Sequence, residues 1–459
     1  MKKLLALLSL LTALVSLSAL AAETETAPSL WPAYDPETGL WGYIREDGTW
    51  GISPQWERAY HFHGGCAIVD TMDVPSWEGE STQGIIDETG AYLLEPEYSI
   101  DDACCMCGAG ELYLVNQYDG ERESGWFNIP NRYFSGLRWT ECYATRETPY
   151  IQINSDYAVS GLADRTTGEI VVPMEYSYTG LCDWGIDGGF IVAEREDTRE
   201  CELIEIGWGP AALPEGVVVD YYPGVTEKLV AFQQDGLYGY LNTEGEIVIP
   251  AQFDAANDFR DSYAEVGLLE EVGMHAIIDR QGQVVLTGIG SRSSYGYNGM
   301  VADALFVEWP DGTWGLVETD GPIRCRHTLP EEAYDAWVYE FTEDGPLWVE
   351  YSLGDDEYLW GLMSREGELL GEPRWTQVFF RQPEEPWVTV CEGGFWDWAD
   401  YVGTWGYADA YGSIVLPVQY AEAELFRGAL ARVQFDDAAE GYINRAGEIV
   451  YRWPAQAER

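Results

Sequence analysis

The chain has 459 residues, of which 46% are hydrophobic and 14% aromatic, so it can bury far more than one ordinary core and is not disordered. It carries 79 acidic residues against 25 lysines and arginines, which gives a formal net charge of −54. Because phosphate groups are bound mainly by Lys and Arg, this charge excludes nucleic acid and anionic lipid as partners and leaves cations, basic proteins and neutral glycans.

Residues 1–21 are typical of an export signal. Lysines precede the apolar run from Leu4 to Leu17, and Ala19-Leu20-Ala21 has the small-x-small pattern that signal peptidase cuts. A membrane anchor is the alternative, but the run is short for a span of about 20 residues. No cysteine follows where a lipid would be attached, and no sorting signal is seen at the C-terminus. We expect a secreted or cell-envelope protein with no membrane span after signal removal and a lead-in at 22–39.

From residue 40 to residue 459 one unit of about 35–46 residues recurs about ten times, the last copy being partial. Degenerate copies fall near 124–153 and 200–232. The unit is marked by an aromatic residue before a glycine, as at Trp41-Gly42, Tyr238-Gly239, Trp314-Gly315, Trp360-Gly361 and Trp405-Gly406. Since alternate residues of a strand face opposite sides, we expect Trp41 to fill the layer between units and Gly42 to let a neighbouring element approach closely.

The rest of each unit also follows a β pattern. A turn of the form Asp/Asn-x-x-Gly comes next, as in Asn242 to Gly245, and a strand that ends at proline follows, as in Ile247 to Pro250. Asp or Asn caps such a turn, the glycine supplies a positive φ, and proline cannot donate to a ladder. No stretch after the signal sustains the helical period of about 3.6 residues. The sequence therefore predicts an all-β chain of tandem hairpin or meander repeats.

These residues resemble the WG-repeat family of exported bacterial proteins, whose unit runs roughly W-G-Y-I-D-x-x-G-x-x-V-I-P-x-x-Y-D. The resemblance implies a repeat scaffold with no general activity and no catalytic residues to carry over. About ten units exceed the roughly 4–8 blades of a β-propeller, and the first and last hairpins repeat each other instead of completing one blade. We therefore expect an open, curved or superhelical array, with one or two β-propellers as the alternative.

Few residues suggest chemistry. His61 and His63, with Cys66 nearby, fit either a partial metal site or surface decoration. The run Asp101 to Cys107 holds three thiols, which fit a soft metal, disulfides or plain burial. We assign no metal site, cofactor or enzyme activity, and expect at most weak divalent-cation binding by surface carboxylates. The nine cysteines, whose redox state stays open, are Cys66, Cys104, Cys105, Cys107, Cys142, Cys182, Cys201, Cys325 and Cys391.

The aromatic residues Phe395, Trp396 and Trp398 lie where an insertion between two units is expected. They could present flat platforms to a ligand or pack over the edge of a repeat. We expect a non-catalytic secreted repeat scaffold for protein–protein recognition outside the cytoplasm. A glycan-binding module is the first alternative, and a carbohydrate-active hydrolase, suggested only by the acidic surplus, is the second.

Overall fold

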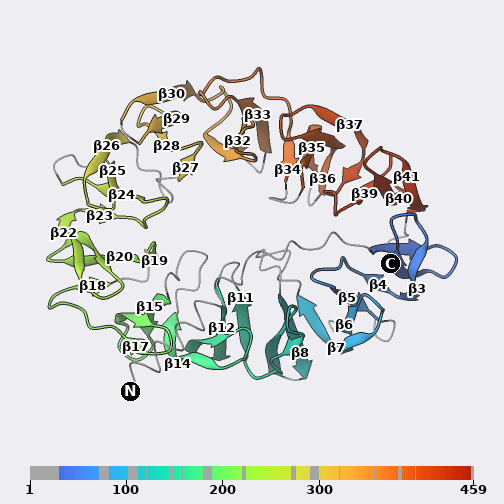
Figure 1. Ribbon diagram of the computed structural model, residues 1–459, viewed down its shortest axis with the longest axis horizontal. Coiled ribbons are helices and arrows are strands. Elements are labelled where there is room, and N and C mark those ends of the chain that lie inside the picture. Colours follow the sequence, from blue (N-terminus) through green and yellow to red (C-terminus); the bar gives the residue numbers. More distant parts are fainter. Residues whose placement is uncertain are drawn as a thin grey trace.

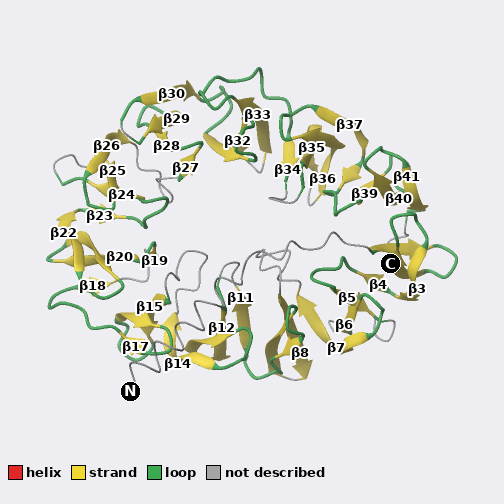
Figure 2. Cartoon of the chain, viewed as in Figure 1, coloured by secondary structure: helices red, strands yellow, loops and turns green. Residues whose placement is uncertain are grey.

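The computed structural model describes residues 30–71, 82–101, 112–119, 121–144, 148–156, 159–178, 189–219, 224–269, 275–289, 299–319, 321–354, 357–380, 385–397 and 400–455. These ranges contain 41 strands and no helix, which confirms the all-β prediction (Figure 2). Within them, no helix is long and apolar enough to cross a membrane. The expected signal at 1–21 lies outside the described residues.

The strands of the first half form antiparallel meanders of consecutive strands, apart from β18 and β19, which both pair with β20. The first sheet contains β1 (Trp31–Asp35), β2 (Leu40–Ile44) and β3 (Trp50–Trp56). The second contains β4 (Arg58–Ala59), β5 (Cys66–Asp70), β6 (Gln83–Asp87), β7 (Tyr92–Asp101), β8 (Leu112–Asp119), β9 (Glu121–Asn128) and β10 (Tyr133–Phe134). The third contains β11 (Glu141–Ala144), β12 (Tyr150–Asp156), β13 (Val159–Asp164), β14 (Ile170–Tyr178), β15 (Phe190–Arg195), β16 (Cys201–Glu205) and β17 (Gly209–Pro210). The fourth contains β18 (Val218–Val219), β19 (Val225–Thr226), β20 (Leu229–Gln234), β21 (Leu237–Asn242) and β22 (Ile247–Phe253).

The second half continues with smaller sheets. The fifth contains β23 (Ala255–Ala256), β24 (Tyr263–Gly267), β25 (His275–Asp279) and β26 (Val284–Ile289). The sixth contains β27 (Met300–Val301), β28 (Ala304–Glu308), β29 (Thr313–Glu318) and β30 (Ile323–Thr328). The seventh contains β31 (Asp335–Glu340), β32 (Leu347–Gly354) and β33 (Glu357–Met363). The eighth contains β34 (Gln377–Phe379), β35 (Trp387–Asp397), β36 (Asp400–Asp409) and β37 (Ile414–Tyr420), and the ninth contains β38 (Glu422–Ala423), β39 (Leu430–Gln434), β40 (Glu440–Asn444) and β41 (Ile449–Trp453).

The turn between the last two strands of a unit has the expected construction. In the turn from Asn444 to Gly447, the Asn444 Oδ1 atom accepts hydrogen bonds from the backbone N–H groups of Ala446 and Glu448, each at 3.0 Å. Gly447 has a φ of 78°, which only glycine adopts readily. The same two acceptor bonds recur at Asn242, Asp279 and Asp409.

The glycine of the aromatic-Gly pair faces the next strand of its own unit. A Cβ atom on Gly239 would lie 2.5 Å from the carbonyl oxygen of Ile249 and 2.7 Å from the backbone nitrogen of Ala251. The register between β21 and β22 shifts at this point, so the strand bulges against the glycine. Gly42 is approached in the same way by the strand that contains Pro54. The prediction that this glycine permits a close backbone approach is confirmed.

The aromatic partner of that glycine fills the space between units. Trp41 is 6% exposed, and its ring meets the ring of Trp453 edge-on with centroids 5.9 Å apart. Trp314, in the sixth sheet, is 1% exposed and contacts Tyr351 of the seventh sheet with centroids 6.1 Å apart. The burial of such rings between sheets that cannot stand alone is the main source of stability expected for stacked repeats.

The nine sheets follow one another round a closed ring, in which β41 lies beside the first sheet (Figure 1). One hydrophobic cluster joins Trp31, Trp41 and Tyr43 of the first sheet to Tyr442 and Trp453 of the last. Of the two arrangements expected, these contacts support the closed one over the open array. The first and last sheets share no strand in the described ranges, so the ring is closed by side-chain packing. From the sequence, we considered only closure by a blade that both ends complete.

The closing junction, by which we mean the contacts of residues 30–70 with residues 422–453, uses the same contacts as the internal junctions. The tyrosine after the repeat glycine donates its hydroxyl proton to a carbonyl oxygen that belongs to the next unit. This bond joins Tyr43 to Tyr60 (2.9 Å), Tyr240 to Asn257 (2.8 Å), Tyr407 to Glu424 (2.7 Å) and, across the closing junction, Tyr442 to Pro32 (2.9 Å). The closing junction therefore contains the same tyrosine–carbonyl hydrogen bond as the internal junctions.

Candidate functional site

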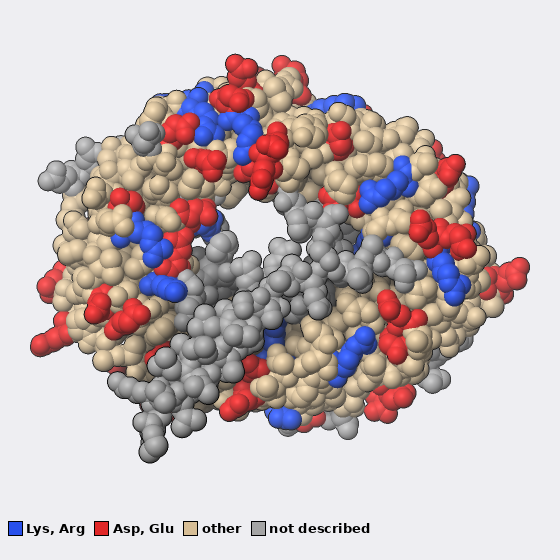
Figure 3. Space-filling model, viewed as in Figure 1, with Lys and Arg blue, Asp and Glu red and all other residues tan. Residues whose placement is uncertain are grey.

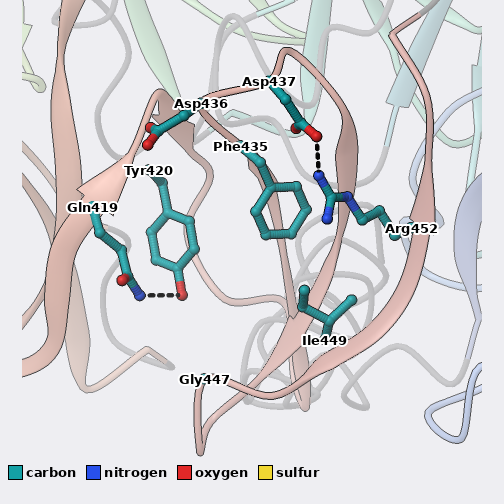
Figure 4. Close-up of a pocket in the computed structure, with 8 residues that line it drawn as sticks. All are labelled: Gln419, Tyr420, Phe435, Asp436, Asp437, Gly447, Ile449 and Arg452. Atoms are coloured by element: carbon teal, nitrogen blue, oxygen red, sulfur yellow. Dashed lines mark hydrogen bonds and ion pairs between the residues drawn. The ribbon is translucent and has the colours of Figure 1, made fainter.

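A groove with a volume of about 400 Å³ lies between the eighth and ninth sheets. It lies between β37 and the hairpin strands of the ninth sheet, and β37 and β41 are on the outer side of the ring (Figure 1). Figure 4 shows the side chains that line it, which are Gln419, Tyr420, Phe435, Asp436, Asp437, Gly447, Ile449 and Arg452. The groove is formed only when two successive units stack.

The floor of the groove is aromatic. Tyr420 is 4% exposed, and its ring stands nearly perpendicular to the partly buried ring of Phe435, with centroids 6.2 Å apart. The side-chain amide of Gln419 donates a hydrogen bond to the Tyr420 hydroxyl at 3.2 Å. Tyr420 is the aromatic residue that follows the strand-ending proline in the repeat pattern, so the repeat itself places it here.

An arginine closes one end of the groove. The Arg452 guanidinium lies over the Phe435 ring, 4.5 Å from its centroid, and pairs with the Asp437 carboxylate. Desolvation alone would raise the pKa of Asp437, but the Ala439 N–H group and the Arg452 guanidinium lower it. The site therefore holds one cation by a ring face and a carboxylate together.

The same arrangement recurs in the sixth sheet. Arg326 lies 4.4 Å from the centroid of Trp309 and pairs with Asp311 at 2.6 Å. The Thr313 hydroxyl and Arg326 lower the pKa of Asp311 to about 2. Arg326 is opposite the repeat glycine Gly315, as Arg452 is opposite Gly441. We call this set of ring, aspartate and arginine the arginine clamp.

The two clamps differ at the residue between the aromatic and the aspartate. That residue is Pro310 in the sixth sheet and Asp436 in the ninth. Asp436 is exposed, and the structure records no hydrogen bond or ion pair for its carboxylate within the described part of the chain. Two carboxylates and one guanidinium therefore line the groove, which leaves it with a local charge of −1.

The aromatic residues singled out from the sequence lie elsewhere. Phe395 and Trp396 belong to β35, where they pair with Val402 and Tyr401 of β36, so this insertion lengthens a hairpin. Trp398 lies outside the described residues. The repeat positions Trp41, Trp314, Trp360 and Trp405 are all buried in the packing between strands and units.

The histidine and cysteine candidates belong to the closing junction and to the core. His61 Nε2 lies 3.3 Å from an Oε2 atom of Glu424, across the junction, and the backbone of His63 pairs with that of Cys66. Burial raises the pKa of the Cys66 thiol to about 11. Among the described residues, no three His, Cys, Asp or Glu side chains are grouped so that they could hold a metal ion.

Among the cysteines that the structure describes, Cys66, Cys142, Cys325 and Cys391 are free thiols. Three of them, Cys66, Cys142 and Cys391, are buried. Cys104, Cys105, Cys107 and Cys182 lie outside the described residues. Burial raises the pKa of the Cys66, Cys142, Cys325 and Cys391 thiols, which keeps these four groups protonated at neutral pH.

The sequence does not single out two carboxyl groups whose pKa is strongly shifted, one partly buried and one fully buried. Burial raises the pKa of Asp258 and of Glu265 to about 7. Glu265 is 1% exposed, and its Oε1 atom lies 2.5 Å from Nδ1 of His275 on the adjacent strand. Glu265 occupies the middle of β24, whose last four residues are all buried, and no local pattern in the sequence distinguishes it from the many exposed acids.

Comparison with known proteins supports the repeat assignment. The family model described as a WG containing repeat matches residues 41–70, 238–268 and 405–437. No curated protein matches the sequence.

Solved structures that resemble the ring have low sequence identity. They include a eukaryotic initiation factor (10% identity, 93% of this chain and 95% of that chain, TM-score 0.42). The computationally designed Ika8 protein covers less (12% identity, 67% of this chain and 93% of that chain, TM-score 0.33). BamB from Moraxella catarrhalis matches at 12% identity over 71% of this chain and 85% of that chain, with a TM-score of 0.29. These scores carry no argument about function. The family match falls on the best-formed repeats of the sequence pattern, which open at Trp41, Tyr238 and Trp405. The chain contains the WG repeat, which is recognised at these three positions.

Proposed function

We propose that the protein is a non-catalytic secreted scaffold that recognises another protein outside the cytoplasm. The observation that carries the proposal is the groove between β37 and β41, which combines a buried aromatic floor with a polar rim on the outer wall. Aromatic residues surrounded by polar groups are typical of the positions that contribute most to protein interfaces. The repeat architecture supports the proposal because stacked units offer an extended surface.

Charge favours a basic partner. The chain has 79 acidic residues and 25 lysines and arginines, and both kinds are interspersed over the face shown in Figure 3. Such a surplus steers cationic partners toward the surface and speeds their association at low ionic strength. Binding by this surface is therefore expected to weaken as salt is added.

A photo-crosslinking experiment tests the proposal. A photoreactive phenylalanine analogue is placed at the exposed Gln419 in the groove and, as a control, at Tyr334, which is 64% exposed in another part of the ring. We expect a salt-sensitive crosslink to a discrete protein of the cell surface or its surroundings from position 419 and none from position 334. Equal crosslinking from both positions, or none from either, contradicts the proposal.

A glycan ligand is the second candidate, because the partly buried ring of Phe435 offers an apolar contact to a sugar ring while Gln419 and Asp436 accept its hydroxyl protons. A glycan array separates the two functions. Binding to a defined glycan that is lost in Phe435→Ala, together with no protein crosslink from position 419, supports the glycan function over the protein function.

The acidic surplus also has a measurable effect on stability. Raising NaCl from about 20 to about 300 mM is expected to increase the unfolding free energy by roughly 1–2 kcal/mol and the Tm by about 2–6 °C, because salt screens the repulsion among carboxylates. Thermal unfolding followed by circular dichroism measures this. A Tm that does not change with salt would mean that the acids are too dispersed or too well paired to repel one another.

A further inference from the structure

We infer that the groove between β37 and β41 binds the guanidinium or ammonium group of a basic side chain in an extended segment of a partner protein. This inference rests on the proposed function and names the chemistry of the ligand. It is carried by the acceptor groups of the groove, by the arginine clamp beside them, and by the apolar residue at the opposite end.

The acceptors in the groove exceed its donors. The Asp436 carboxylate has no recorded partner within the described ranges, and the Asp437 carboxylate is engaged by Arg452. The amide nitrogen of Gln419 is used on the Tyr420 hydroxyl, which leaves the carbonyl oxygen of the same amide as a further acceptor (Figure 4). A ligand that brings several N–H donors and a positive charge satisfies these groups, whereas an anionic ligand meets a local charge of −1.

The arginine clamp shows how this environment holds a cation. Arg452 is bound by the face of Phe435 and by Asp437, and Arg326 is bound by Trp309 and Asp311 in the same way. A second cation beside Asp436 would meet a carboxylate of the same kind. In the sixth sheet Pro310 replaces Asp436, so that clamp offers no second carboxylate.

The far end of the groove is apolar. Ile449 is 52% exposed and, in Figure 4, lies at the opposite end of the groove from Asp436 and Asp437. Alternate side chains of an extended peptide point to the same side. The segment that fits is therefore one in which a basic residue and an apolar residue face the groove together, separated by a residue that faces solvent.

Two synthetic peptides test the inference. The first is acetyl-Ser-Arg-Ser-Ile-Ser-amide, and the second has citrulline in place of arginine, which keeps the shape and removes the charge. Titration of the intact protein, observed through the peptide NMR signals, gives the Kd. We expect the arginine peptide to bind about tenfold more tightly than the citrulline peptide, and Asp436→Asn to remove this preference.

The control variant is Asp344→Asn, which makes the same change of charge at an exposed turn in the seventh sheet. It is expected to leave the Kd within about twofold of the original, since it alters only the long-range field. Asp436 and Asp344 are both exposed, so neither substitution disturbs the core, and circular dichroism checks this.

The inference is overturned if Asp436→Asn and Asp344→Asn weaken binding equally, which means non-specific attraction to an acidic surface, or if arginine and citrulline peptides bind alike. Its failure is distinguishable from failure of the proposed function. If the peptide results are negative while position 419 still crosslinks to a protein, the scaffold function stands and the ligand chemistry is wrong. If neither is observed, both are wrong.

Discussion

Replacement of Gly239 by alanine is expected to lower the free energy of unfolding by about 3 kcal/mol, the largest effect we expect from adding a single methyl group. The new Cβ atom would lie 2.5 Å from the carbonyl oxygen of Ile249 and 2.8 Å from the carbonyl carbon of Pro250. Both atoms belong to backbone held by the hydrogen bonds between β21 and β22, so the strands must separate to make room. Urea unfolding followed by tryptophan fluorescence measures the loss.

Gly236→Ala is the matched control, three residues earlier in the same hairpin. Gly236 has a φ of 82° and no atom within 4 Å of its hypothetical Cβ, so alanine there costs only the strain of a left-handed conformation, about 1 kcal/mol. If the two variants are equally stable, the repeat glycine is not required by the approach of β22, and the packing explanation of the aromatic-Gly pair is wrong.

Lowering the pH from about 7 to about 4.5 is expected to loosen the closing junction by on the order of 2 kcal/mol, about thirtyfold in its opening equilibrium. Burial lowers the pKa of His61 to about 4, below its ordinary 6.5, with Arg427 adding to the effect and Glu424 opposing it. His61 therefore binds a proton more readily in the open state than in the closed state. The stability of the closed junction is complete above pH 6.5 and is lost as the pH falls toward 4. Arg432 also faces His61 and Glu424.

Hydrogen–deuterium exchange of peptides covering residues 58–70 and 422–434, corrected for the intrinsic effect of pH, measures this opening. His61→Gln is expected to abolish the pH dependence. His327→Gln, which alters a histidine that hydrogen-bonds Gly367 away from the junction, is expected to keep it. The contributions of Asp258 and Glu265 to stability change in the opposite sense, because their raised pKa values favour the folded state as the pH falls below about 7. The opening must therefore be measured locally, at the junction. Unchanged protection at the junction in the wild type would contradict the prediction.

The strands and turns were predictable because their determinants are local. Asn444 and Gly447 specify a turn within four residues, and the approach of β22 to Gly239 follows from the alternation of side chains along one hairpin. Closure of the ring was not predictable in this way. It depends on small rotations that accumulate from unit to unit, and no single repeat encodes their sum.

The groove was predictable only in part. The repeat pattern marks Tyr420, but Asp436 and Arg452 reach it from a different unit, and their meeting depends on how two sheets stack. The acidic surplus hides Asp436 among 79 carboxylates. Composition likewise drew attention to Phe395 and Trp396, where the structure gives a lengthened hairpin and the groove lies on other strands.

The chemical likeness of the closing junction to the internal ones has a consequence for how the chain can vary. An open stack of repeats needs specialised capping units that shield its two terminal faces from water, and it tolerates the gain or loss of a unit. In this ring the hydrophobic cluster that joins Trp41 to Trp453, together with the Tyr442–Pro32 bond, covers both terminal faces at once, so neither face requires a cap. These contacts also constrain the number of units, because inserting or deleting one would carry Tyr442 away from Pro32 and expose both faces.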